Sequence, residues 1–142
     1  AAPAARTLRP ALARGRLAGG NLALLSALAG TPWAPRFDGA IAVFEDVNEA
    51  TYRVDRMLRQ LLLAGCLAGC RGIAFGHCTA CPEHHEDDGR RTLAAVVREV
   101  ADALDVPAVL GVPVGHLDEQ WTIPLGATAV LDADEASMIV EW

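Results

Sequence analysis

The sequence predicts an α/β domain with a mixed sheet, and three observations support this fold class. Short apolar runs that end at polar residues alternate with segments whose apolar residues have helical spacing, which is typical of α/β proteins. Hydrophobic residues make up 52% of the 142 residues, which excludes general disorder because a core of useful size is available. Two short apolar runs near the C-terminus flank a polar turn, and this pattern predicts a β-hairpin.

The chain length is that of one domain. Residues 1–13 are rich in Ala, Arg and Pro without a clear period, and we expect them to form a tail or the remnant of a linker. The globular pattern begins near Arg14, so residues 14–142 are predicted to form the domain.

The first elements are a strand and a helix. Residues 16–18 predict a short strand that leads into Gly19 and Gly20. Asn21 is a good N-cap for the helix that follows, because its side-chain oxygen can accept from the exposed amides of the first turn. Gly30 and the nearby Pro32 are expected to end this helix.

A buried strand and an amphipathic helix come next. Residues 40–44 form an uninterrupted apolar run, which predicts a strand buried on both faces. Asn48 or Thr51 is expected to cap the following helix, and Gly65 to end it. The apolar residues of this helix have i, i+3, i+4, i+7, i+8 spacing. They are Val54, Met57, Leu58, Leu61 and Leu62.

The second half repeats the alternation and ends in strands. Residues 73–75 predict a short strand, and a polar loop over residues 77–88 follows, with Asp87 or Asp88 as the expected cap of the next helix. The buried face of that helix is predicted to comprise Leu93, Val96, Val97, Val100 and Leu104. Residues 107–112 predict a further strand, and residues 127–131 and 137–140 predict the hairpin.

Charge and hydropathy exclude two classes of partner. The chain has 12 basic residues, all Arg, against 18 acidic residues, which gives a formal net charge of −6. A nucleic-acid-binding protein needs a basic face to replace phosphate counterions, so no nucleic-acid partner is expected. No apolar run approaches the roughly 20 residues that span a bilayer, so no membrane partner is expected either.

Polar residues follow three of the predicted strands. Glu45 and Asp46 end the first, His77 the second and His116 the third. In α/β sheets ligands bind outside the carboxyl ends of strands, so these positions are candidate site residues. Glu45 and His116 form an acid–base pair in which the carboxylate would fix the imidazole tautomer and leave the other nitrogen free to take a proton. In the alternative interpretation, Glu45 caps a helix and His116 is an ordinary loop residue.

A nucleophile for such a pair is missing. The two serines of the chain are Ser26, within a Leu-rich helix, and Ser137, within the last predicted strand. Neither has the Gly-x-Ser-x-Gly context of a strained elbow, so both are interpreted as structural.

The polar loop offers a second hypothesis. Cys78 and Cys81 have the C-x2-C spacing of zinc knuckles, and His84 or His85 could supply further ligands. Structural zinc sites usually place the second ligand pair farther away, so a solvated polar loop without metal is favoured. A Cys78–Cys81 disulfide is a further alternative, disfavoured in a reducing compartment.

The charged residues after Thr51 also allow two interpretations. Arg53, Asp55 and Arg56 could bind a substrate carboxylate, because Arg binds carboxylates in a bidentate manner. The i, i+3 and i, i+4 spacing of helical ion pairs favours a surface network instead.

Three sequence blocks resemble the motifs of one enzyme family. Residues 19–25 with Gly30 and Thr31 resemble a G-G-N-L-x-L-L…G-T block. Residues 43–58 resemble an L-x-E-D-x-x-E-x-x-Y-x-I-D-R-M-L block, and residues 111–116 with 124–126 resemble a P-x-G-H…P-x-G block. In these blocks, which occur in the family's order from about Gly15 to the C-terminus, the chain resembles the LD-carboxypeptidases, the muramoyltetrapeptide carboxypeptidases that are grouped with the microcin C immunity peptidases.

The resemblance implies both a fold and a catalytic pair. Family members have an N-terminal α/β domain with the serine nucleophile and oxyanion hole, and a C-terminal domain of the swivelling β/β/α type. The C-terminal domain supplies the glutamate and histidine of a Ser-His-Glu triad, which implies Glu45 as the triad carboxylate and His116 as the general base. This chain matches the C-terminal domain only, so we expect it to be a fragment that is inactive alone.

The resemblance also implies a substrate and partners. The expected reaction is hydrolysis of the amide that links terminal D-Ala to a murein tetrapeptide during cell-wall recycling, without a cofactor or metal, in the cytoplasm. The expected partners are the murein peptide, the chain's own N-terminal domain and a second copy in a homodimer. The alternatives are a microcin C immunity-type peptidase and a non-catalytic zinc-binding module.

Overall fold

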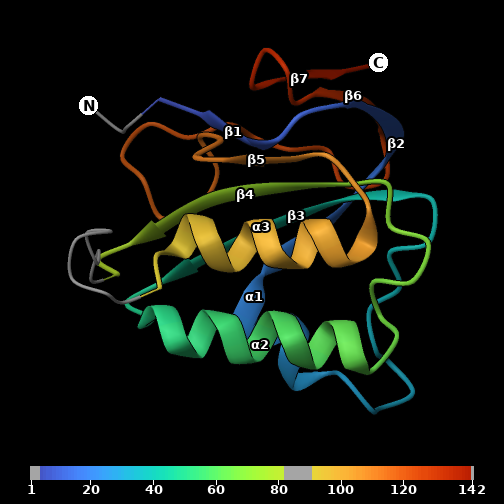
Figure 1. Cartoon of the computed structure of the whole chain (residues 1–142), viewed down its shortest axis with the longest axis vertical. Helices are drawn as coiled ribbons and strands as arrows, with labels where there is room; N and C mark the ends of the chain where they lie inside the picture. The colour runs from blue at the N-terminus through green and yellow to red at the C-terminus, as the bar shows by residue number, and fades with distance from the viewer. Residues whose placement is uncertain (1–3, 82–90, 142) are drawn as a thin grey trace.

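One mixed sheet organises the chain in the computed structural model, which describes residues 4–81 and 91–141 (Figure 1). Within these residues the sheet has seven strands in the order β1-β5-β4-β3-β2-β6-β7. The elements are β1 (Arg6–Arg9), β2 (Leu12–Asn21), α1 (Leu22–Ala27), β3 (Ala40–Val47), α2 (Thr51–Leu63), β4 (Gly72–Thr79), α3 (Leu93–Leu104), β5 (Ala108–Leu110), β6 (Thr128–Asp132) and β7 (Ser137–Val140).

Strand direction confirms the predicted mixed α/β fold. The four central strands β2, β3, β4 and β5 are parallel, whereas β1, β6 and β7 pair antiparallel with their neighbours. Strands β6 and β7 form the predicted C-terminal hairpin. The carboxyl ends of β3 and β4 therefore lie together at one edge of the sheet, where parallel α/β proteins bind ligands.

The predicted tail over residues 1–13 is wrong from Arg6 onward. Residues Arg6–Arg9 form β1, which pairs with β5 at the edge of the sheet, and β2 already begins at Leu12. An edge strand needs a partner on one side only, so it does not require the apolar run of a central strand. Its contribution to the core is Leu8, which packs against the helix-covered side.

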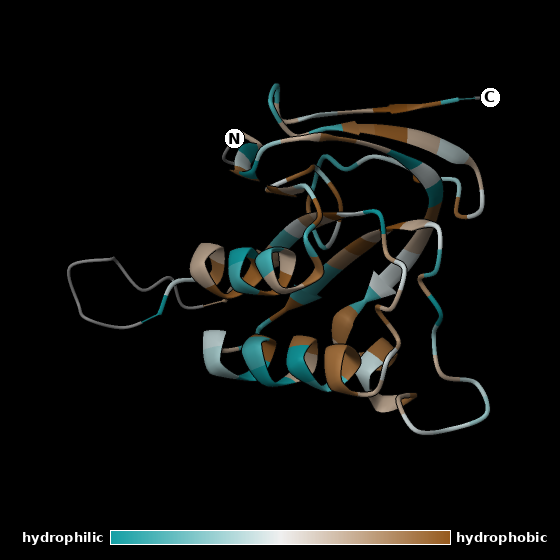
Figure 2. Ribbon diagram, turned by 45° about the vertical axis from the view of Figure 1, so that its right-hand side comes forward, coloured by the Kyte–Doolittle hydropathy of each residue, from teal (hydrophilic) through white to brown (hydrophobic). Residues whose placement is uncertain are grey.

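The three helices cover one face of the sheet and bury the larger core (Figures 1 and 2). The buried apolar residues of α2 and α3 all belong to this core. Phe37, Phe44 and Phe75 lie at the centre of this core, with ring centroids 5.4 Å and 6.4 Å apart along the series. A smaller core on the opposite face is formed by side chains of the central strands with Val112 and the β6 region.

The helix boundaries differ from the predicted caps. Helix α2 begins after Ala50, which makes no side-chain capping bond, so neither Asn48 nor Thr51 is the cap. Thr92 caps α3, since its hydroxyl accepts from the Ala95 amide at 3.1 Å. Asp87 and Asp88, the caps expected there, lie outside the described residues. Asn21 caps α1 as predicted, by accepting from the Leu24 amide.

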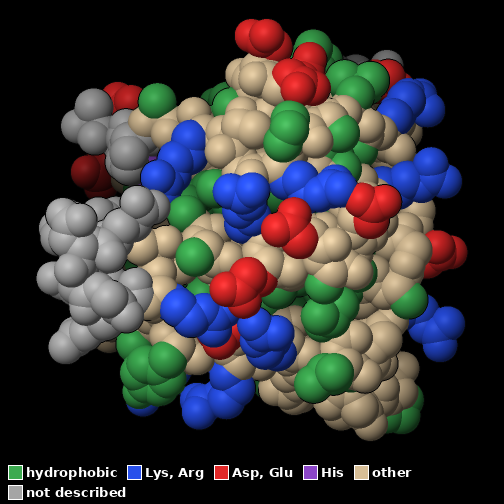
Figure 3. Space-filling model, viewed as in Figure 1, with side chains coloured by type: hydrophobic (Ala, Val, Ile, Leu, Met, Phe, Trp, Pro, Cys, Tyr) green, Lys and Arg blue, Asp and Glu red, His purple; other side chains and the backbone are tan. Residues whose placement is uncertain are grey.

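Ion pairs link the outer faces of α2 and α3, where Figure 3 shows basic and acidic side chains interspersed. Arg59 lies 2.9 Å from Asp55 and 2.8 Å from Glu99, and Arg91 pairs with the same two carboxylates. Asp55 therefore belongs to a surface network, as the helical spacing favoured. Within the described residues, no helix combines the length and apolar character needed to cross a membrane.

Candidate functional site

The end of β3 presents two adjacent carboxylates to opposite faces of the sheet. Successive side chains in a strand alternate between faces. Phe44 packs in the helix-covered core and Val43 in the opposite core, so Asp46 lies on the helix side and Glu45 on the other side. Both are nearly inaccessible, with 8% of Glu45 and 2% of Asp46 exposed.

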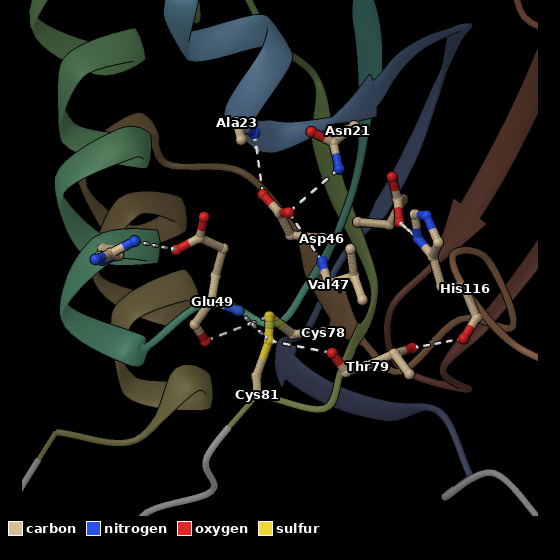
Figure 4. The surroundings of a disulfide bond; sticks show 11 residues. Asn21, Ala23, Asp46, Val47, Glu49, Cys78, Thr79, Cys81 and His116 are labelled. Atoms are coloured by element: carbon tan, nitrogen blue, oxygen red, sulfur yellow. Dashed lines mark hydrogen bonds and ion pairs between the residues drawn. A yellow bond between two sulfur atoms is a disulfide. The ribbon is translucent and has the colours of Figure 1, made fainter.

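Asp46 is a structural anchor for the start of α1. Its Oδ1 accepts from the Asn21 side-chain amide at 3.2 Å and from the Val47 backbone amide at 2.9 Å. Its Oδ2 accepts from the backbone amide of Ala23, in the first turn of α1, at 3.0 Å (Figure 4). The sequence allowed Glu45 to cap a helix, but it is Asp46 that binds the first turn of a helix.

Glu45 lies next to His116. The Oε2 atom of Glu45 is 2.9 Å from Nδ1 of His116, although 71 residues separate the two in the sequence. Only 11% of the Glu45 side chain is exposed, compared with 56% of the His116 side chain. An ionised carboxylate can only accept, so Nδ1 carries the hydrogen in this contact when the ring is neutral, and Nε2 is then the basic nitrogen.

Two glycines make this contact possible. Gly115 has φ +126°, and a Cβ atom there would lie 3.2 Å from the Cβ and Oε2 atoms of Glu45. A Cβ on Gly76 would lie 2.3 Å from the Val114 carbonyl oxygen. A larger residue at position 76 would therefore keep the segment that carries Val114 and His116 from approaching β4. The backbone amide of His77 donates to the same Val114 oxygen at 3.0 Å.

The end of β4 bulges beside Glu45. Phe44 pairs with Phe75 and Asp46 with Cys78, so Gly76 and His77 together oppose the single residue Glu45. His77, the third polar strand end predicted from the sequence, thus reaches the same sheet edge. Its Nε2 atom is buried, without a hydrogen-bond partner among the described residues.

Neither serine is presented to the Glu45–His116 pair. Ser26 is buried in α1, where its hydroxyl donates to the Ala23 carbonyl at 3.0 Å. Ser137 begins β7, which is separated from β3 by β2 and β6 in the sheet. Both positions agree with the structural interpretation of these residues.

The segment Cys78–Cys81, here called the cysteine loop, contains a disulfide, which the sequence analysis disfavoured. Cys78 and Cys81 are bonded, with Cα atoms 5.4 Å apart. A C-x2-C pair at a strand end allows this closure as readily as metal binding, and the disulfide occupies the two thiolates that zinc would need. His84 and His85 lie outside the described residues, and within those residues no cluster of three or more metal-binding side chains occurs.

Sequence reasoning missed Thr79, which lies between the two cysteines. Its hydroxyl donates to the His116 backbone carbonyl at 2.8 Å, and its own carbonyl accepts from the Asn48 amide at 2.8 Å. A lone threonine in a polar loop carries no sequence signal for such a contact. The only available hint was its place between two cysteines that follow a predicted strand.

Comparisons with known proteins place this geometry in context. Residues 14–131 match the model of the LD-carboxypeptidase C-terminal domain. A putative carboxypeptidase of Synechocystis is 36% identical over 127 residues, which are 89% of this chain and 42% of the relative. The murein tetrapeptide carboxypeptidase of Pseudomonas aeruginosa is 37% identical over 123 residues, covering 84% and 38%.

Solved structures show the same fold. The muramoyltetrapeptide carboxypeptidase of Oxalobacter formigenes aligns with a TM-score of 0.77 and 32% identity, covering 95% of this chain and 48% of that chain. The MccF structure with glutamyl sulfamoyl guanosine aligns with a TM-score of 0.80 and 26% identity, covering 97% and 41%. The chain thus spans less than half the length of these relatives. The matched residues include Glu45 and His116, and the chain belongs to the LD-carboxypeptidase C-terminal domain family.

Proposed function

We propose that this chain is the C-terminal part of a serine-type LD-carboxypeptidase that releases terminal D-Ala from murein tetrapeptide. The observation that carries the proposal is the 2.9 Å contact between Nδ1 of His116 and the shielded carboxylate of Glu45. This is the arrangement in which an imidazole acts as a general base through Nε2. The murein substrate is supported by the names of the relatives from Pseudomonas aeruginosa and Oxalobacter formigenes.

In the proposed reaction, His116 Nε2 takes the proton of a serine hydroxyl as its oxygen attacks the carbonyl of the L,D-amide. The imidazolium then returns the proton to the leaving amine of D-Ala, and water hydrolyses the resulting acyl-enzyme by the same proton transfers. Glu45 holds the ring in the required tautomer and stabilises the imidazolium. No step of this reaction requires a cofactor.

The serine nucleophile is proposed to come from an N-terminal domain, which is one of two proposed protein partners of this chain. Relatives are more than twice as long as the matched region. Ser26 is buried in α1 and bonded to Ala23, and Ser137 lies in β7, which β2 and β6 separate from β3. A second copy of the chain, in a homodimer, is the other proposed protein partner. Recycling of murein peptides places the enzyme in the cytoplasm in this proposal.

Release of D-Ala from murein tetrapeptide tests the proposal directly. We expect the 142-residue chain to be inactive and a longer protein that includes the N-terminal domain to be active. In the longer protein, His116→Gln and Glu45→Gln should reduce turnover. Glu119→Gln, a matched change at an exposed carboxylate, should leave turnover unchanged. Normal turnover by the 142-residue chain would refute the proposal, as would full activity of the His116 variant.

The alternative function is that of a microcin C immunity-type peptidase. The observation that favours it is the alignment with MccF, at a TM-score of 0.80 over 97% of this chain. The longer protein should then cleave an aminoacyl sulfamoyl nucleoside faster than murein tetrapeptide. Parallel assays with both substrates, compared by kcat/KM, distinguish the two functions.

A further inference from the structure

The loop Cys78–Cys81 connects the two segments that carry Glu45 and His116. Thr79 donates its hydroxyl to the His116 backbone carbonyl at 2.8 Å. The Thr79 carbonyl accepts from the backbone amide of Asn48, three residues beyond Glu45. Figure 4 shows Thr79 between the disulfide and His116. One residue is thus bonded to both sides of the candidate site.

The disulfide restrains this loop at both ends. Cys78 is the residue before Thr79, and Cys81 accepts from the Glu49 backbone amide at 3.3 Å through its Sγ atom. The disulfide therefore links the end of β4 to the turn between β3 and α2. Thr79 is the last residue of β4 and pairs with Val47 of β3. The disulfide adds a covalent restraint beside this pair, which helps to keep the Thr79 hydroxyl within reach of His116.

We propose that Thr79 is a positioning residue for His116, and that the Cys78–Cys81 disulfide makes this positioning dependent on the redox state. In the oxidised chain, Thr79 fixes the backbone of His116 so that Nδ1 faces Glu45. In the reduced chain, the loop is released and His116 loses its defined contact with Glu45. The consequence for catalysis rests on the proposed function, whereas the consequence for the imidazole does not. A reducing cytoplasm, the compartment of the proposed function, would hold the chain in its reduced form, so the positioned form is the one that oxidation produces.

Reduction of this disulfide is a two-electron exchange with a dithiol. A thiolate of the dithiol attacks one of the two sulfurs, releases the other cysteine as a thiolate and forms a mixed disulfide. The second thiolate of the reagent then attacks the reagent's own sulfur in the mixed disulfide and releases the remaining cysteine. The reagent ends as a disulfide, and its two protons remain on Cys78 and Cys81. Neither cysteine of this pair is fully buried, unlike Cys66 and Cys70.

The tautomer of His116 provides a readout that does not need enzymatic activity. Long-range ¹H–¹⁵N correlation spectra of the labelled 142-residue chain distinguish an imidazole protonated at Nδ1 from one protonated at Nε2. A His116→Gln variant assigns the relevant signals, because they disappear from its spectrum. All samples contain a chelator, so that no metal replaces the disulfide.

We expect the oxidised chain to show His116 as the Nδ1–H tautomer when the ring is neutral, and reduction to abolish this preference. Thr79→Val should abolish it without reduction, whereas Thr79→Ser, which keeps the hydroxyl, should restore it. In a Cys78→Ser/Cys81→Ser variant the preference should already be lost, and the dithiol should have no further effect. Thermal unfolding of each variant shows whether the fold is retained.

Two results would overturn the proposal. His116 signals that are identical in oxidised and reduced wild-type chain would remove the redox dependence. Signals of a folded Thr79→Val variant that match those of wild type would remove the positioning role. If the tautomer responds as expected but the longer protein releases no D-Ala, the proposed function fails while the positioning role stands.

Discussion

The carboxylates on the two faces of the sheet at the end of β3 differ in how many hydrogen bonds they accept. On the helix-covered face, Asp46 accepts three hydrogen bonds from neighbouring groups and is 2% exposed. On the opposite face, the Glu45 side chain has one hydrogen-bond partner among the described residues, the His116 ring, whose side chain is 56% exposed. The buried hydrogen bonds of Asp46 stabilise the fold. The contact of Glu45 with Nδ1 of the accessible His116 ring leaves Nε2 of that ring available for chemistry. Adjacent residues of one strand can therefore separate stability from function.

The largest expected effect is the loss of kcat on the face that carries Glu45 and His116. In the longer protein, His116→Ala should lower kcat for D-Ala release by about 10²–10⁴-fold, the usual contribution of a positioned general base. The free energy of unfolding should change little, because the side chain is largely exposed. Steady-state kinetics and chemical denaturation of the same variant check both parts. A large loss of stability would contradict the contrast between the two faces.

Asp46→Ala should have the opposite profile. It removes the acceptor of two backbone amides and of the Asn21 side chain, and we expect a loss of about 2–3 kcal/mol in the free energy of unfolding. Urea denaturation measures this loss. Glu45→Ala is the matched control on the other face, and its loss should be clearly smaller. Equal losses for the two variants would show that the faces do not differ.

Gly115→Ala should affect both properties. The positive φ of Gly115 is costly for a residue with a Cβ atom, and that atom would lie 3.2 Å from the Glu45 carboxylate. We expect a loss of about 1–3 kcal/mol in unfolding free energy. In the longer protein we also expect reduced kcat, since the Glu45 side chain that contacts His116 must shift to make room. Gly126→Ala is the control, because it combines a positive φ of 92° with no close neighbour. It should lower stability without a specific loss of kcat.

A smaller effect is expected at the N-cap of α3. Thr92→Ala removes the side-chain acceptor of the Ala95 amide and should cost about 1 kcal/mol of unfolding free energy. Thr92→Ser keeps the acceptor and should recover most of it. Denaturant midpoints of the two variants check this prediction. Activity of the longer protein should be unchanged in both.

The smallest expected effect concerns the buried cysteines of the helix-covered core. Burial raises the pKa of the Cys70 thiol, so its reactive thiolate is scarce at neutral pH. In dithiol-treated chain, we expect iodoacetamide to label Cys78 and Cys81 before Cys70. Mass spectrometry of peptides from timed samples measures the order. Faster labelling of Cys70 would show that this core opens more readily than the cysteine loop.

Local pattern was sufficient for most of the fold. The apolar run of residues 40–44 predicted a buried strand, and β3 is a central parallel strand. Helical spacing located α2, whose predicted face supplies Val54, Leu58 and Leu61 to the core. By contrast, β1 was missed because its pairing with β5 depends on a segment about 100 residues away in the sequence. Helix caps were also unreliable, because several polar residues near each helix start can serve.

The sequence by itself determined the alternation of strands and helices, the family and the candidate pair Glu45 and His116, because periodicity and motif blocks are local properties. Only the tertiary structure showed that the side chains of Glu45 and His116 meet and that Asp46 binds the start of α1. It also revealed that Thr79 bonds to His116 and that Cys78 and Cys81 form a disulfide. These contacts join segments that are distant in sequence, or depend on the path of a loop. They are therefore set by how strands pair and bulge, which no single segment encodes.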